Sequence, residues 1–208
     1  QRCMAASNLL VVGKCDQLLE EIFEKSKNFT AGKNIGAIIT KESLARIRLA
    51  IEKNIHEKNC QLKIDGREII TPQEYKNGNW LGPTILDHVN PNSTLACEEL
   101  FGPVLSVIRC QNLAEALSIE NKNPYGNAAS IFTTNGAAAE YFVNNARAGM
   151  IGINIGIPVP REPFSFGGFY DSKFGNGDIT GKLGIEFWTQ KKKITAKWFV
   201  QNQTNWMS

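Results

Sequence analysis

The 208 residues of this chain suffice for one large domain, and 42% of them are hydrophobic, which permits a packed core. The 23 basic and 20 acidic side chains leave a net charge of only +3, which gives no reason to expect nucleic acid or an acidic membrane as a partner. No apolar run is long enough to span a membrane, and no segment resembles a secretory signal. Composition therefore disfavours membrane and nucleic-acid functions.

Cysteine and histidine usage disfavours disulfides and metal sites. The cysteines are odd in number and include no C-x-x-C pair, so we expect reduced thiols in a cytosol-like compartment. His56 and His88 lack the spacing of metal ligands, and we expect both to be exposed to solvent. The five cysteines are Cys3, Cys15, Cys60, Cys97 and Cys110.

The first third of the chain predicts a strand and two helices. Residues 8–12 are a short apolar run typical of a buried strand, and residues 3–7 before it can form a short helix. Asp16 is predicted to cap an amphipathic helix, and Thr40 to cap a second helix that reaches about residue 58.

The remainder alternates strands and helices after a turn-rich tract at 65–83, and such alternation predicts an α/β fold with a mostly parallel twisted sheet. A glycine-rich loop region and a short helix near residues 184–187 follow, and the last predicted strand is polar enough for a sheet edge. The predicted strands are 104–109, 128–133, 150–154 and 189–199, and the predicted helices between them are 112–122 and 135–147.

Cys3 is the candidate nucleophile. A lone cysteine is most often a small buried hydrophobe. Here Arg2 precedes it and helix-forming residues follow, and a thiol beside a cation at a helix N-terminus more readily forms the nucleophilic thiolate. This pattern indicates a nucleophilic cysteine but is a weak motif by itself.

Four segments together resemble the aldehyde dehydrogenase superfamily and cover the chain nearly end to end. Residues 1–5 (QRCMA) resemble its catalytic cysteine segment, and residues 98–104 (EELFGPV) its E-E-[IL]-F-G-P-V segment. Residues 123–134 resemble its N-x-x-Y-G stretch with the strand that follows, and residues 166–168 (FGG) its P-F-G-G loop. Residues 154–160 (NIGIPVP), with Asn127 in place of the commoner Leu, further resemble the CoA-acylating methylmalonate-semialdehyde dehydrogenases.

The resemblance implies a role for individual residues. Cys3 would attack the aldehyde and carry the acyl group as a thioester, and its backbone N–H would be one oxyanion donor. Arg2 would bind the substrate carboxylate through its planar fork, unless it only forms a structural ion pair. Glu99 would accept hydrogen bonds from the nicotinamide ribose. Phe101 would pack beside that ribose and its ring, and Phe166 would line the substrate tunnel.

Some of these positions keep a second interpretation. Without the family pattern, Glu99 is a surface acid and Phe101 an ordinary core aromatic. Gly167 and Gly168 would supply the backbone freedom for the turn beside Phe166. Arg161 is either a second contact for the substrate carboxylate or a surface residue, and we favour the surface.

The resemblance also implies how the protein is divided. Residues 1–188 would be the cysteine-bearing catalytic domain, residues 189–199 an oligomerisation strand and residues 200–208 a polar tail. The sequence has no G-x-G-x-x-G, so the NAD-binding domain of the family would lie before Gln1. The parent protein would be a homodimer or homotetramer.

The implied activity is NAD-dependent oxidation of malonate semialdehyde or methylmalonate semialdehyde, with CoA as co-substrate, to acetyl-CoA or propanoyl-CoA. The location would be cytoplasmic, or the mitochondrial matrix in a eukaryote. Two alternatives stay open: another aldehyde dehydrogenase subfamily, or a non-catalytic fragment that acts only through its oligomerisation edge.

Overall fold

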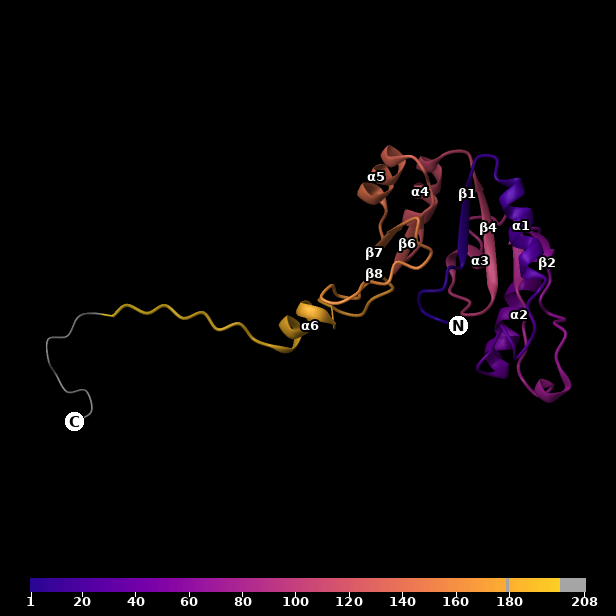
Figure 1. Ribbon diagram of the computed structural model, residues 1–208, viewed down its shortest axis with the longest axis horizontal. Helices are drawn as coiled ribbons and strands as arrows, with labels where there is room; N and C mark the ends of the chain where they lie inside the picture. Colours follow the sequence, from indigo (N-terminus) through magenta and orange to yellow (C-terminus); the bar gives the residue numbers. More distant parts are fainter. Residues whose placement is uncertain (179, 199–208) are drawn as a thin grey trace.

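The main sheet has four strands in the order β1-β4-β3-β2, and it lies at the end of the molecule away from α6 (Figure 1). The computed structural model describes residues 1–178 and 180–198. Strand β4 pairs in parallel with β1 and with β3, and β2 pairs antiparallel to β3 at the edge. The predicted mostly parallel α/β sheet is therefore confirmed. The strand bounds are β1 Asn8–Val12, β2 Gln61–Ile64, β3 Thr84–Asp87 and β4 Val104–Cys110.

Helices cover both faces of this sheet. One core cluster joins Leu19 and Phe23 of α1 (Asp16–Ser26) to Val107 of β4. A larger cluster on the other face joins Ile47 and Ile51 of α2 (Lys41–His56) to α3 (Thr94–Cys97), α4 (Leu113–Lys122) and alternate residues of β3 and β4. Side chains of a strand point alternately to its two faces, which explains why β4 contributes to both clusters.

Two small sheets extend the fold beyond α4. Strands β6 (Ala128–Ile131) and β7 (Met150–Ile153) pair in parallel, and α5 (Gly136–Asn145) connects them. Strands β5 (Tyr125–Gly126) and β8 (Phe169–Tyr170) pair antiparallel. Figure 1 shows α6 (Gly181–Trp188) beyond these sheets, on the side away from α1 and α2. A single turn of 3-10 helix, η1 (Gln73–Tyr75), lies in the tract predicted to be turn-rich.

Helix caps show where the sequence-based predictions were right and where they were wrong. The side chain of Thr40 accepts a hydrogen bond from the Ser43 N–H, and Asn112 and Asn135 cap α4 and α5 in the same way. Asp16 is not the predicted cap, because Cys15 occupies that position without a side-chain hydrogen bond. The Asp16 carboxylate instead pairs with Arg109 of β4, at 2.8 Å.

The predicted terminal strand is not seen as a strand. In the single chain, residues 189–198 form no strand and are all exposed, and residue 199 lies outside the described residues (Figure 1). An edge strand needs a partner with which to exchange backbone hydrogen bonds, and no other described strand pairs with this segment. The role of residues 189–199 in pairing subunits therefore stays a prediction. None of the described helices is long and apolar enough to cross a membrane.

Candidate active site

Cys3 lies at the centre of a tight turn directly before β1. The Ala5 N–H donates to the Arg2 carbonyl at 3.1 Å, which closes the turn around Cys3 and Met4. The predicted short helix over residues 3–7 was wrong: the Ser7 carbonyl already accepts a bond from Ser106 of β4, so the chain enters the sheet after one turn. The Cys3 side chain is exposed and forms no disulfide.

Gln1 fixes the outer end of this turn. Its side-chain amide donates to the Ala37 carbonyl at 2.7 Å, and its amide oxygen accepts from the Ile39 N–H at 3.0 Å. Two reciprocal bonds of this kind hold an amide in one orientation. The turn that carries Cys3 is thus anchored on one side to the loop before α2 and on the other to β4.

The segment from Glu98 to Val104 connects α3 to β4 beside this turn. Arg46 of α2 donates to the carbonyls of Glu99 and Leu100, the latter at 2.7 Å, and so holds the segment from the helix side. Phe101 has a φ of 58°, a left-handed conformation that is rare for a bulky residue and is often found at functional sites. Its ring stays 43% exposed, so it is not the ordinary core aromatic of the alternative interpretation.

A small pocket of about 40 Å³ brings the two segments together. Arg2 lies on its N-terminal side, and Glu99 and Phe101 lie on the side of the α3–β4 connection. Neither the Arg2 guanidinium nor the Glu99 carboxylate forms an ion pair or a side-chain hydrogen bond with any described residue, which leaves both groups available for a ligand. Three of the predicted site residues therefore meet at one place, although they are almost a hundred positions apart in sequence.

Phe166 lies in a loop outside this pocket. Its N–H donates to the Thr180 hydroxyl at 2.8 Å, and its side chain is half-buried. The next residues pack tightly: a Cβ added to Gly149 would come within 2.5 Å of the Gly167 carbonyl oxygen and 2.8 Å of the Gly168 Cα. Arg161, before this loop, is exposed as expected of a surface residue.

The loop of Phe166 and the turn of Cys3 meet at Asn127, which the sequence marks only through its resemblance to the subfamily. Its amide donates to the Cys3 carbonyl at 3.1 Å and to the Met4 sulfur at 3.2 Å. Its side-chain oxygen and its Cα lie at 3.1 and 3.2 Å from the position that a Cβ on Gly168 would take. Only the rarity of Asn at this place in the family pattern could have drawn attention to it.

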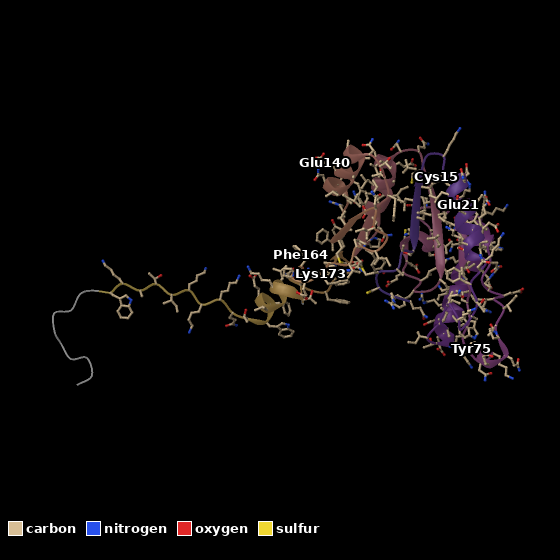
Figure 2. All side chains as sticks on the ribbon, viewed as in Figure 1. Cys15, Glu21, Tyr75, Glu140, Phe164 and Lys173 are labelled. Atoms are coloured by element: carbon tan, nitrogen blue, oxygen red, sulfur yellow. The ribbon has the colours of Figure 1, made fainter. Side chains whose placement is uncertain are left out.

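A more open hollow of about 310 Å³ lies over the loop that follows β8. It is lined by residues 168–170, Lys173 and residues 175–177, and of the predicted residues it includes Gly168 alone. Lys173 pairs with Asp178 at 2.8 Å. Figure 2 shows Lys173 and Phe164 in the region between the small sheets and α6. This hollow contains no candidate nucleophile.

The other cysteines differ from Cys3 in their surroundings. Burial raises the pKa of the Cys60 thiol, and burial together with a nearby glutamate raises the pKa of Cys97 and Cys110. Cys110 belongs to the larger core cluster, and Cys60 and Cys97 pack against it. Cys15 packs against the smaller cluster and its sulfur faces the Val12 carbonyl. Among the described residues, no group of three or more His, Cys, Asp or Glu side chains could hold a metal ion.

The exposed Cys3 therefore lies on the same turn as Arg2, and Arg2 shares a pocket with Glu99 and Phe101 on an α/β sheet. The aldehyde dehydrogenase family model matches residues 1–194, and the chain belongs to the aldehyde dehydrogenase family. The predicted resemblance to this family is thereby confirmed.

Two curated relatives are similar to nearly the whole of this chain. The human methylmalonate-semialdehyde/malonate-semialdehyde dehydrogenase [acylating], a mitochondrial protein, is 41% identical over 210 residues, which are 98% of this chain and 39% of that protein. A Caenorhabditis elegans protein described in the same terms is 45% identical over 204 residues, or 95% of this chain and 39% of the relative. The chain thus spans about two-fifths of the length of the curated relatives it matches.

Solved structures agree with the sequence comparison. A methylmalonate-semialdehyde dehydrogenase of Sinorhizobium meliloti, in complex with NAD, superposes with a TM-score of 0.90 at 38% identity, covering 96% of this chain and 42% of that one. The corresponding enzyme of Oceanimonas doudoroffii also gives 0.90, at 34% identity and with the same coverage. A Mycobacterium tuberculosis aldehyde dehydrogenase in complex with NAD+ gives 0.80 at 29% identity, covering 92% of this chain and 40% of that one.

Proposed function

We propose that this chain supplies the nucleophile and part of the substrate and cofactor sites of an NAD-dependent, CoA-acylating methylmalonate-semialdehyde or malonate-semialdehyde dehydrogenase. The observation that carries the proposal is the exposed Cys3 turn, whose Arg2 lines the same small pocket as Glu99 and Phe101. The similarity of nearly the whole chain to acylating semialdehyde dehydrogenases supports the choice of substrate.

The Cys3 thiolate attacks the aldehyde carbon, and the carbonyl oxygen becomes the alkoxide of a thiohemiacetal. The backbone N–H of Cys3 donates to no described residue, so it is free to donate to that developing oxyanion. NAD, if held by Glu99 and Phe101, would supply the acceptor for the hydride on this carbon, and Cys3 would then carry a thioester. The bond to the substrate carboxylate then breaks to release carbon dioxide, and the thioester enolate that remains takes a proton. The CoA thiolate then attacks the thioester, which gives the acyl-CoA and releases the Cys3 thiolate.

Arg2 is the anchor for the substrate carboxylate in this proposal. A guanidinium remains charged at all relevant pH and meets a carboxylate with two parallel hydrogen bonds. Its alternative role, a structural ion pair, has no support among the described residues, because Arg2 is absent from every ion pair they form. Phe166 contributes an apolar wall to the same substrate space in our proposal.

Glu99 and Phe101 have the chemistry to hold the nicotinamide end of NAD. The unpaired carboxylate of Glu99 can accept from both hydroxyls of a ribose, and the half-exposed ring of Phe101 offers an apolar surface beside it. The pocket that these residues line is too small for a whole dinucleotide, so further residues must bind the adenosine half. We propose that these lie in a domain outside the sequence described.

The test is CoA-dependent reduction of NAD by either semialdehyde, measured with the full-length protein. We expect Cys3→Ala to abolish it and Cys15→Ala to leave it within twofold of wild type, because Cys15 lies beyond the opposite end of β1 (Figure 2). Omission of CoA should prevent formation of the acyl-CoA product. Equal activity of wild type and Cys3→Ala would refute the proposal.

A second role is favoured by a separate observation. Apolar side chains of α6 and of the segment after it are exposed, among them Ile194 at 80% and Trp198 at 92%. Apolar surface of this kind commonly marks a protein interface. A chain without the cofactor domain would then act only by joining a parent oligomer, and would show binding without NAD reduction.

A further inference from the structure

We infer that Asn127 is a positioning residue for Cys3: its side-chain amide holds the peptide on which the nucleophile is carried and joins that peptide to the loop of Phe166. The inference rests on the proposed function of Cys3 as nucleophile. No motif used above gives Asn127 a role in the chemistry, and it comes from another part of the chain, 124 positions after Cys3.

The bond falls on the part of the turn that has most freedom. In a four-residue turn the peptide between the two central residues can face either way, and this orientation separates turn types I and II. Here that peptide joins Cys3 to Met4, and its carbonyl is the group that accepts the 3.1 Å bond from Asn127. Asn127 therefore fixes the ψ angle of Cys3, and this backbone geometry determines the direction of the Cys3 side chain.

Asn127 is itself held rigidly. Its carbonyl accepts from the N–H of Met150 at the start of β7, at 3.2 Å, and the preceding Gly126 bonds with both Gly149 and Ser172. On the other side it lies against Gly168, where a Cβ would meet both Asn127 and Ser172 at about 3.1 Å. A donor on a fixed backbone can orient a mobile turn, whereas a donor on a mobile loop cannot.

The second donor of the same amide has a weak partner. It faces the Met4 thioether sulfur at 3.2 Å, and a thioether is a poor acceptor. The strong bond is the one to the Cys3 carbonyl, so loss of the amide should act through Cys3. A neutral hydrogen bond of this kind changes an equilibrium about three- to tenfold.

The experiment compares Asn127→Leu with Asn145→Leu in the full-length protein. Asn145 is a matched control, since its exposed amide also donates to a backbone carbonyl, that of Tyr141 at 2.7 Å, but on α5. We measure kcat and KM for the semialdehyde, the melting temperature, and the rate at which iodoacetamide alkylates Cys3, mapped by peptide mass. Asn127→Gln keeps an amide donor and serves as the conservative variant.

We expect Asn127→Leu to lower kcat and the alkylation rate of Cys3 about three- to tenfold with little change in KM. Asn145→Leu should leave both rates within twofold of wild type, and Asn127→Gln should restore part of the loss. If Asn127→Leu changes the melting temperature but neither rate, Asn127 is only structural and the inference is overturned. The proposed function fails separately, if Cys3→Ala retains activity.

Discussion

Cys3 differs from the other cysteines in exposure and in the groups around it. Its side chain is exposed on a turn, whereas Cys60, Cys97 and Cys110 pack against the core and have raised pKa values. A buried thiol with a raised pKa is largely protonated near neutral pH and reacts slowly. The difference gives a physical reason for one of five cysteines to serve as nucleophile.

Replacement of Arg2 tests the binding of the substrate carboxylate. Arg2→Lys keeps the charge but loses the planar fork, so we expect KM for the semialdehyde to rise about tenfold, or ~1.4 kcal/mol, with no loss of thermal stability. Arg161→Lys is the matched control, because Arg161 is exposed and stands near the Phe166 loop in sequence. If only Arg161→Lys raises KM, the substrate carboxylate binds to Arg161 and not to Arg2.

Asp87 should make the stability of the fold depend on acid pH. Its carboxylate is 1% exposed and takes two bonds from Arg109, at 3.0 and 2.8 Å, and one from the His88 N–H. Burial alone would raise the pKa of Asp87, but these bonds outweigh it and the pKa lies below its usual value. The stabilisation is therefore complete above about pH 4, the unfolded pKa, and is lost as the pH falls through the folded pKa.

We expect Asp87→Asn to lower the free energy of unfolding by about 3 kcal/mol at pH 7, and by progressively less as the pH falls below about 4. Urea unfolding at pH 7 and at a series of pH values below 4 measures this difference. Asp65→Asn is the control, because the ion pair of Asp65 with Arg67 lies at the surface and should contribute under about 1 kcal/mol. If Asp87→Asn lowers the free energy of unfolding equally at pH 7 and at acid pH, the stabilisation does not come from the ionised Asp87 carboxylate.

At the scale of elements, most caps and strands were predictable, and two strands beside the turn-rich tract were not. Thr40, Asn112 and Asn135 begin helices because local side-chain bonds suffice for a cap. Strands β2 and β3 were missed although β6 and β7, also of four residues, were predicted, because β2 and β3 directly flank the turn-rich tract at 65–83. Asp16 was misassigned because its partner, Arg109, is distant in sequence.

The candidate site was likewise predictable only in part. Cys3, Glu99, Phe101 and Phe166 could be picked out, because each lies in a recognisable motif. Their spatial relation could not, since it depends on contacts across the chain such as that of Asn127 with Cys3. The helix expected after Cys3 was wrong because pairing with β4 begins at Ser7.

The contact between Gly149, the residue before β7, and the Phe166 loop can be tested by substitution. A Cβ at this position would collide with backbone atoms of Gly167 and Gly168, so Gly149→Ala should destabilise the fold by about 1–3 kcal/mol and shift the loop. Gly66→Ala is the control, since a Cβ there would meet backbone atoms of Gly82, far from this loop in sequence. We expect both variants to melt earlier and only Gly149→Ala to raise KM for the semialdehyde. Equal KM values in the two variants would show that the Phe166 loop does not take part in substrate binding.

At the scale of the whole molecule, the segment after α6 leaves the body of the chain without packing on it (Figure 1). Residues 189–198 are all exposed. Exposure of the apolar side chains in this segment to water is unfavourable unless another subunit covers them. We propose that this segment pairs with a second subunit, and that the parent protein is a dimer or tetramer.

Removal of residues 189–208 should therefore reduce the oligomer to smaller species, measured by light scattering of the full-length protein. Removal of residues 200–208 alone, the polar tail, should leave the assembly unchanged. An unaltered mass after the longer deletion would show that subunits associate elsewhere.

The most direct test of the account is to trap the acyl group. Full-length protein is mixed with methylmalonate semialdehyde and NAD, CoA is withheld, and the peptides are mapped by mass spectrometry after acid quenching. We predict a propanoyl or methylmalonyl group on the peptide that contains Cys3, which disappears when CoA is added. An acyl group on another cysteine, or none while NAD is still reduced, would contradict the assignment of Cys3 as the nucleophile.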